Sequence, residues 1–204
     1  MSLYQRYVLP RLVHASMRQP RFLPYRRRAV QAARGCVLEI GVGSGLNLPL
    51  YSQDVTHVIG LEPSATLLAK AREASASAGR PIELVEGTAE AIPLETGTVD
   101  TVVTTWTLCT IPDVAAALAE VRRVLGPDGR LLFVEHGRAP DPRVTRWQDR
   151  LTPLWRRIAG GCHLNRPIRD LVEGAGFRVE QLETGYMEGP RPMTFTYEGS
   201  ARPR

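Results

Sequence analysis

The fold is decided by the stretch Val37-Leu38-Glu39-Ile40-Gly41-Val42-Gly43-Ser44-Gly45-Leu46-Asn47. An apolar run ends in three glycines at alternate positions, which is typical of a buried strand followed by a tight loop. Glycines let the backbone turn sharply and let a ligand approach the amides without a Cβ in the way. Leu46 occupies the place of the third glycine of a dinucleotide loop, and no GxxxxGK[ST] pattern follows, so neither NAD nor a nucleoside triphosphate is favoured.

Short apolar β-branched runs alternate with helical patterns on either side of this loop. This alternation predicts βαβ units and a doubly wound α/β fold with a parallel sheet covered on both faces. Ser64 is expected to cap the second helix and Gly79 to end it, and the turn cluster at 126–129 is expected to end the third. The expected strands are 36–40, 57–61, 82–85, 99–105 and 130–135, and the expected helices are 46–52, 65–78 and 112–125.

The C-terminal third has a different pattern. Helical stretches containing Arg and Trp run from 138 to 158 and stop at Gly160-Gly161, and a last helix is expected over 167–174. Two strand-like runs, 177–183 and 193–197, are close enough in the chain to pair antiparallel. Residues 200–204 are expected to form a loose tail.

Length and composition are those of one globular domain. The chain has 204 residues, 43% hydrophobic and 23% charged, without an uncharged apolar run long enough to span a bilayer. Arginines interrupt the N-terminus where a secretory signal would be apolar, so a cytoplasmic protein is expected. The three cysteines are widely spaced and form no CxxC pair, so neither a disulfide framework nor a thiolate metal site is expected, and no metal ligand is assigned.

A carboxylate follows the second expected strand in the segment Gly60-Leu61-Glu62-Pro63. At the carboxyl end of the strand next to the glycine loop, Glu62 can accept both hydrogen bonds from a ribose diol, and Pro63 ends the strand. The structural alternative is that Glu62 is an acidic residue favoured by the dipole of the following helix.

Two further segments complete a set that resembles a known family. They are Gly87-Thr88-Ala89-Glu90-Ala91-Ile92-Pro93 and the expected fourth strand, which continues to Trp106. In order and spacing, the chain from Val37 to Glu135 resembles the class I S-adenosylmethionine-dependent methyltransferases. The resemblance implies a mainly parallel seven-stranded sheet with an antiparallel last strand, S-adenosylmethionine as cofactor and S-adenosylhomocysteine as product.

The same resemblance assigns the cofactor residues. Glu39 would orient the loop or the amino group, Glu62 would hold the ribose, and the backbone near Thr105 and Trp106 would meet the methionyl amine. Many relatives have Asp at the position of Thr88, whose hydroxyl is a weaker acceptor, so adenine recognition then falls to Glu90. The full expected set is Glu39, Gly41, Gly43, Gly45, Asn47, Glu62, Pro63, Thr88, Ala89, Glu90, Thr105 and Trp106.

Within this superfamily the chain resembles the methyltransferase-like 7 group, which look like alkyl-thiol methyltransferases. The residues that carry this resemblance lie at 107–111, 133–136 and 161–166, and small phospholipid and quinone methyltransferases share similar features. The expected function is therefore methyl transfer to a small, fairly apolar acceptor, preferably a thiol sulfur. The alternatives are a phospholipid, another amine or a hydroxyl as acceptor, and a sensor that binds the cofactor without turnover.

A thiol acceptor must become a thiolate, so a nearby base is expected. His136 is the first candidate because it ends the fifth expected strand, and His163, in the glycine-rich break, is the second. Trp106 and Cys109, with His136, are expected to line the acceptor pocket. For each of the four side chains a purely structural role remains open, such as core packing or a local hydrogen bond.

Residues 1–34 form a basic arm that contains eight arginines and no acidic residue, whereas the remaining chain, over 35–199 and the tail, has a net charge of −3. We interpret the arm as a helical lid over the cofactor with solvated arginines. Alternatively, it lies on an anionic membrane surface. Nucleic acid is a third interpretation, against which the slightly acidic body argues. The sequence does not indicate an oligomeric state.

Overall fold

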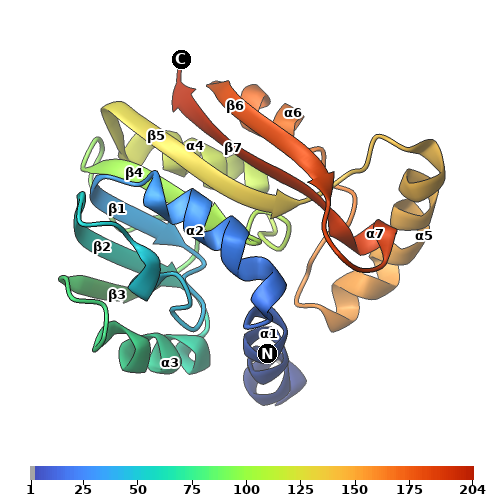
Figure 1. Cartoon of the computed structure of the whole chain (residues 1–204), viewed down its shortest axis with the longest axis horizontal. Helices are drawn as coiled ribbons and strands as arrows, with labels where there is room; N and C mark the ends of the chain where they lie inside the picture. Colours follow the sequence, from blue (N-terminus) through green and yellow to red (C-terminus); the bar gives the residue numbers. More distant parts are fainter. Residues whose placement is uncertain (1–2) are drawn as a thin grey trace.

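A computed structural model describes residues 3–204, so the first two residues of the expected arm lie outside it. Its centre is one seven-stranded sheet in the order β3-β2-β1-β4-β5-β7-β6, with helices on both faces (Figure 1). β7 pairs antiparallel with both β5 and β6, and the other strand pairs are parallel. The expected doubly wound sheet with an antiparallel last strand is confirmed. The strands are Gly35–Ile40 (β1), Val55–Glu62 (β2), Ile82–Glu86 (β3), Val99–Thr105 (β4), Leu125–His136 (β5), Phe177–Tyr186 (β6) and Phe195–Pro203 (β7).

The longer helices begin at capping side chains. Ser64, Asp113 and Asp141 each accept a backbone N–H of the first turn, and the expected cap at Ser64 is thereby confirmed. The helices are Leu9–Met17 (α1), Leu23–Gln31 (α2), Ala65–Ser75 (α3), Val114–Val124 (α4), Pro142–Ile158 (α5), Ile168–Gly174 (α6) and Arg191–Thr194 (α7), with short turns at Tyr4–Val8, Pro20–Phe22 and Leu48–Leu50.

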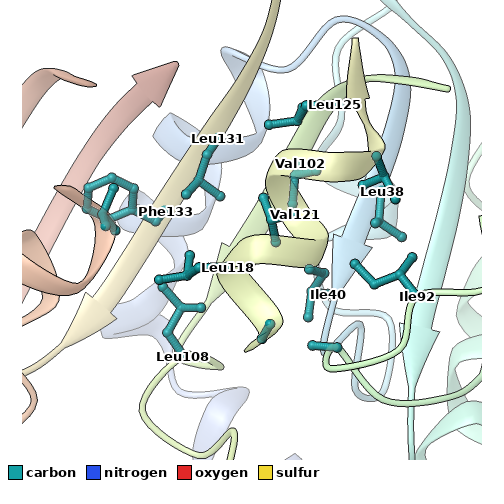
Figure 2. Packing of buried hydrophobic residues seen from close by; sticks show 14 of the residues in the cluster. Leu38, Ile40, Ile92, Val102, Leu108, Leu118, Val121, Leu125, Leu131 and Phe133 are labelled. Carbon is teal, nitrogen blue, oxygen red and sulfur yellow. The ribbon is translucent and has the colours of Figure 1, made fainter. Parts of the chain in front are cut away.

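Apolar side chains fill both faces of the sheet. On one face, side chains of β1, β4 and β5 such as Leu38, Val102 and Leu131 pack against Leu118 and Val121 of α4 (Figure 2). On the other, a second cluster joins the same strands to α2 and α3. Strands buried on both faces are nearly continuously apolar, which is why the apolar runs of the sequence located them well.

The expected helix over 46–52 is wrong. Only a short 3-10 turn, Leu48–Leu50, follows the glycine loop, and Tyr51 is already extended. Pro49 has no N–H to continue a helical hydrogen-bond ladder, and the preceding residue is disfavoured in the helical region. The glycine loop therefore has no long helix behind it.

Two expectations near β5 and β7 are also wrong. The segment 126–129, expected as a turn, belongs to β5, where the pairing with β4 shifts register between Val99 and Thr101. The expected loose tail is strand up to Pro203, and Ala201 is completely buried. β7 lies between β5 and β6, so its backbone has hydrogen-bond partners on both sides.

The basic arm packs onto the body of the protein. Val30 of α2 and Ala33, just after that helix, are fully buried, and Arg28 forms a bidentate pair with Glu198 of β7, both contacts at 2.7 Å. Arg26 is buried as well, contrary to the expectation that the arginines of the arm are solvated. Among the residues described, none belongs to a helix with the length and apolar character required to cross a bilayer.

Candidate cofactor and acceptor site

The glycine loop leaves β1 in a conformation that only glycine adopts easily. Gly41, Gly43 and Gly45 have φ values of +68°, +57° and +79°. A Cβ at Gly41 would lie 2.4 Å from Oγ1 of Thr107, whereas a Cβ at Gly43 would meet nothing closer than 3.8 Å. Gly41 is therefore required by packing, and Gly43 borders an open space into which a ligand can approach the backbone.

Glu62 lies at the edge of that space. Its Oε2 accepts the Gly43 N–H at 3.1 Å, and its Oε1 accepts the Ser64 N–H at 3.0 Å, at the start of α3. Burial raises the pKa of Glu62, and the two backbone hydrogen bonds oppose this rise. A carboxylate has about four acceptor positions, so two remain for the hydroxyls of a ribose.

Glu39 is buried behind the loop and holds it in place. Its oxygens accept the Asn47 side-chain amide and the Tyr51 hydroxyl, each at 2.8 Å, and burial raises the pKa of Glu39 to about 7. The same amide donates to Oγ1 of Thr105 at 3.1 Å. Because these polar groups already have protein partners, Glu39 and Asn47 position the loop.

Sequence reasoning missed Arg26 as a member of this network. Its guanidinium donates to Asn47 Oδ1 at 2.8 Å and to Thr105 Oγ1 at 3.3 Å, while Nε is buried without a partner. Burial lowers the pKa of Arg26, and Glu39 opposes this. The available signal was helical spacing, since Arg26 shares the buried face of α2 with Ala29 and Val30.

The arm also reaches the glycine loop through α1. Nδ1 of His14 lies 2.6 Å from Oγ of Ser44, within hydrogen-bond distance. Burial is the main cause that lowers the pKa of His14. α1 and α2 thus both contact the glycine loop, against which the expected cofactor would bind.

Trp106 connects the arm to the end of β4. It is the only residue other than glycine with positive φ (+54°) in the described part of the chain. Its ring packs edge to face on Phe22 with centroids 4.9 Å apart, and the guanidinium carbon of Arg26 lies 5.1 Å from its ring centroid. A bulky residue in this region is strained, which is typical of functional sites.

The expected adenine-binding segment begins beside Glu62, because the Gly87 N–H donates to the Glu62 carbonyl at 3.3 Å. Thr88 is exposed, whereas Ala89 packs into the core. Glu90 accepts the Asp113 N–H at 3.4 Å, and Pro63 is exposed.

On the acceptor side, the fold brings His136 to two cysteines. Nε2 of His136 lies 3.3 Å from Sγ of Cys162, which lies 3.8 Å from Sγ of Cys109. The Cys109 thiol and then His136 lower the pKa of Cys162 to about 4, against the effect of burial. Burial lowers the pKa of His136, but the contact with Cys162 and the nearby Glu135 carboxylate together outweigh it and raise the value. Cys162, which sequence reasoning did not select, therefore adjoins the expected base.

His163 holds the loop that carries Cys162. Its backbone N–H donates to the Cys109 carbonyl at 2.8 Å, and its Nδ1 lies 3.2 Å from the same oxygen. Burial is the main cause that lowers the pKa of His163. The described contacts of His163 thus agree with a purely structural role, as a residue that forms local hydrogen bonds.

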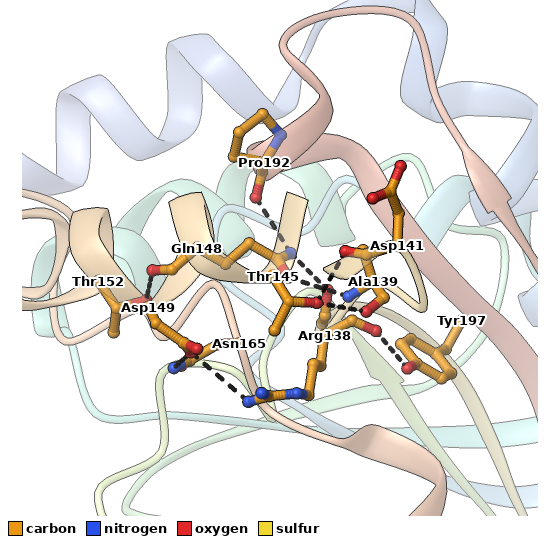
Figure 3. A network of polar contacts seen from close by, with 11 residues as sticks. Arg138, Ala139, Asp141, Thr145, Gln148, Asp149, Thr152, Asn165, Pro192 and Tyr197 are labelled. Carbon is orange, nitrogen blue, oxygen red and sulfur yellow. Dashed lines mark hydrogen bonds and ion pairs between the residues drawn. The ribbon is translucent and has the colours of Figure 1, made fainter. Parts of the chain in front are cut away.

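A polar network fixes the chain on either side of this cluster (Figure 3). Gln148 of α5 is completely buried, accepts the Ala139 N–H at 2.9 Å and donates to the Gly137 carbonyl at 2.9 Å. Asn165 donates to Asp149 at 2.7 Å. α5 is thereby tied both to the segment after His136 and to the loop that contains Cys162.

The cradle at Gly43 and the two free acceptor positions of Glu62 fit an adenosyl group. A family model described as "Methyltransferase domain" matches residues 38–133, the part of the chain that forms this cradle. These residues form a class I S-adenosylmethionine-dependent methyltransferase domain.

Relatives in this methyltransferase class act on different acceptors. "Thiol S-methyltransferase TMT1B" of Rattus norvegicus is 33% identical over 152 residues, 72% of this chain and 62% of that protein. "Phosphatidylethanolamine N-methyltransferase" of Cereibacter sphaeroides is 39% identical over 117 residues, 55% of this chain and 57% of that protein. The chain thus spans about three fifths of the length of these curated relatives.

A solved methyltransferase structure has the same fold. The YcgJ protein of Bacillus subtilis superposes with a TM-score of 0.66 at 23% identity, covering 81% of this chain and 72% of that one.

Proposed function

We propose that this protein transfers the methyl group of S-adenosylmethionine to the thiol sulfur of a small, fairly apolar acceptor. The observation that carries the proposal is the cluster of His136, Cys162 and Cys109 at the carboxyl ends of β4 and β5, where open α/β sheets bind ligands. Similarity to thiol S-methyltransferases supports the choice of sulfur.

Cofactor binding uses groups that are already held in place. Glu62 would accept the ribose hydroxyls, and the Gly43 backbone would allow close approach. The network of Glu39, Asn47 and Arg26 would keep the loop in its binding conformation. The bound cofactor would supply the activated methyl group.

The acceptor side has to align and deprotonate the thiol. Methyl transfer is an in-line displacement, so alignment supplies much of the rate and no protein nucleophile is required. A thiol has an ordinary pKa of about 8.5 and reacts as thiolate. We assign its deprotonation to the His136–Cys162 pair, with the neutral form of His136 as the proton-accepting group.

An acceptor screen with isotopically labelled S-adenosylmethionine tests this function. Alkyl thiols, amines, phenols and ethanolamine phospholipids are offered under equal conditions, with the Glu62→Ala variant as the cofactor-binding control. We expect labelled thioether from the apolar thiols. For His136→Gln we expect slower turnover at neutral pH while calorimetry still detects cofactor binding.

The other outcomes are distinct. If amines or phospholipids become labelled and thiols do not, the thiol acceptor is contradicted, but the protein is still a methyltransferase. Tight cofactor binding without any labelled product would contradict catalytic activity and favour a sensor that binds the cofactor without turnover.

A lipid acceptor is the second candidate, and one surface favours it. The outer face of α5 exposes Trp147, Leu154 and Ile158, and Arg143, Arg146 and Arg150 surround Trp147. Tyr4 of the basic arm donates to the Ile158 carbonyl at 2.6 Å, so arm and α5 are adjacent. Apolar side chains bordered by arginines suit the surface of an anionic bilayer.

Vesicle sedimentation tests the lipid candidate. If a lipid is the acceptor, anionic vesicles should retain the protein, the double variant Trp147→Ser/Leu154→Ser should lose retention, and neutral vesicles should retain neither. If anionic vesicles retain wild type and variant equally, this surface does not bind the membrane and no longer supports the lipid candidate.

A further inference from the structure

Three soft donor atoms converge from three separate parts of the chain. Cys109 follows β4, His136 ends β5 and Cys162 lies in the loop after α5. The two sulfur atoms and a ring nitrogen of His136 all lie within 4.8 Å of one another, and their side chains are buried. Cys36, the third cysteine, lies apart at the start of β1.

Two of the three separations match those of ligands around a tetrahedral zinc ion, and the third, between Cys109 Sγ and the His136 ring, is within 4.8 Å. Zinc–sulfur bonds of about 2.3 Å place two sulfur ligands about 3.8 Å apart, and a zinc–nitrogen bond of about 2.0–2.1 Å places nitrogen about 3.5 Å from each sulfur. The observed values are 3.8 Å between the sulfurs and 3.3 Å from Cys162 Sγ to His136 Nε2.

The protein backbone holds the donors in this arrangement. The His163 N–H donates to the Cys109 carbonyl at 2.8 Å, which fixes the loop of Cys162 against Cys109. Arg166 is buried and donates to the carbonyls of Leu108 and Ile111, the latter at 2.7 Å. The segment that carries Cys109 is therefore clamped on both sides.

The surroundings also suit a charged centre. The Arg166 guanidinium lies close enough to interact with both cysteines. The buried indole N–H of Trp155 interacts with Cys162 and is available to a sulfur ligand. Outer-shell donors of this kind orient metal ligands.

We propose that Cys109, His136 and Cys162 bind one zinc ion and leave its fourth coordination position open. Thiolate and imidazole ligands select zinc over magnesium or calcium, and three protein ligands with an open position are typical of reactive rather than structural zinc. The wide sequence spacing that argued against a metal site says nothing about these distances, because folding brings the donors together.

A role for the ion rests on the proposed function. The acceptor thiol would replace water at the open position and release its proton to solvent, and His136 would then be a ligand instead of the proton acceptor. A carbon–sulfur bond to the thiolate would form as the sulfonium carbon–sulfur bond breaks, with the electron pair kept by S-adenosylhomocysteine. The neutral thioether is a weaker ligand than thiolate and would leave in exchange for water.

Metal analysis of the purified chain tests the site directly. The protein is dialysed against zinc chloride with a reductant that does not bind metal, freed of excess zinc by gel filtration, and measured by inductively coupled plasma mass spectrometry. We expect about one zinc ion per chain in wild type and in the control Cys36→Ser. Competition with a chromophoric chelator should show affinity weakened by more than about 100-fold in Cys162→Ser, beyond the loss of an outer-shell partner.

A measurement on the unaltered protein guards against misfolded variants. Cobalt(II) added to wild type should give intense sulfur-to-cobalt charge-transfer absorption that zinc abolishes. Absence of both zinc and this absorption, equal zinc affinity in Cys162→Ser, or a Cys109–Cys162 disulfide that persists in the presence of the reductant would overturn the site. Zinc binding without thiol methylation would contradict the proposed function alone, and thiol methylation without zinc would contradict the metal site alone.

Discussion

The cofactor side and the acceptor side of the site are assembled in different ways. On the cofactor side, Glu39, Gly43 and Glu62 lie close together in the sequence, on two adjacent parallel strands and the loop between them. On the acceptor side, Cys109, His136 and Cys162 come from three distant segments. The cofactor side can be predicted from a motif because one strand–loop–strand stretch builds it, whereas the acceptor side depends on how α5 and the loop after it pack.

The largest effect is expected where the cofactor loop is most crowded. Gly41→Ala adds a Cβ at positive φ that clashes with Thr107, so we expect it to lower the free energy of unfolding by about 2–5 kcal/mol. Gly97→Ala is the matched control, because Gly97 has φ of +73° but open space, and about 1–2 kcal/mol is expected there. If urea unfolding shows the same loss of unfolding free energy in Gly41→Ala and Gly97→Ala, Thr107 does not crowd the loop.

The arm should behave as part of the cofactor side. Arg26→Met leaves Oδ1 of Asn47 without its buried donor and removes one of the two donors to Oγ1 of Thr105, so we expect about 2–3 kcal/mol of lost stability and weaker cofactor binding. The neighbouring Arg27 is exposed, and Arg27→Met should change stability by less than about 0.5 kcal/mol. If both variants unfold alike, the arm is not coupled to the loop.

Glu62→Ala probes the ribose contact itself. Loss of charge-assisted hydrogen bonds should weaken cofactor affinity by about 1–3 kcal/mol in calorimetry. Glu86→Ala is the matched control, since Glu86 ends the adjacent strand in register with Glu62 but is exposed. Unchanged affinity in Glu62→Ala would remove this residue from the site.

The smallest effect concerns a buried carboxyl on the acceptor side. Glu135 accepts the Thr107 N–H at 3.0 Å, its Oε2 has no partner, and burial raises its pKa to about 7. A raised folded-state pKa contributes stability at low pH that is lost as pH rises from about 4.5 through about 7.

Glu135→Gln should therefore remove part of this loss, about 1–2 kcal/mol, when urea unfolding at pH 5 is compared with pH 8. The exposed Glu95 serves as control, and Glu95→Gln should keep the wild-type pH dependence. A steeper loss in Glu135→Gln than in wild type would mean that Glu135 is charged in the folded protein at pH 5.

The comparison also explains what the sequence could predict. Apolar strands and the loop from Gly41 to Gly45 were found because their signals are local. The helix expected after Gly45 failed because Pro49 interrupts it, and the tail failed because insertion of β7 between two strands is a long-range event. Helical spacing could have placed Arg26 on a buried face, but neither it nor the sequence around Cys162 indicates the distant groups that these two residues contact.

A crystal structure of the protein with S-adenosylhomocysteine tests the central claim most directly. The account predicts the ribose hydroxyls within hydrogen-bond distance of the Glu62 carboxylate, the methionyl part against Gly43, and the sulfur directed toward the side of His136. A product bound elsewhere, or a glycine loop closed by side chains so that no adenosyl group enters, would contradict it.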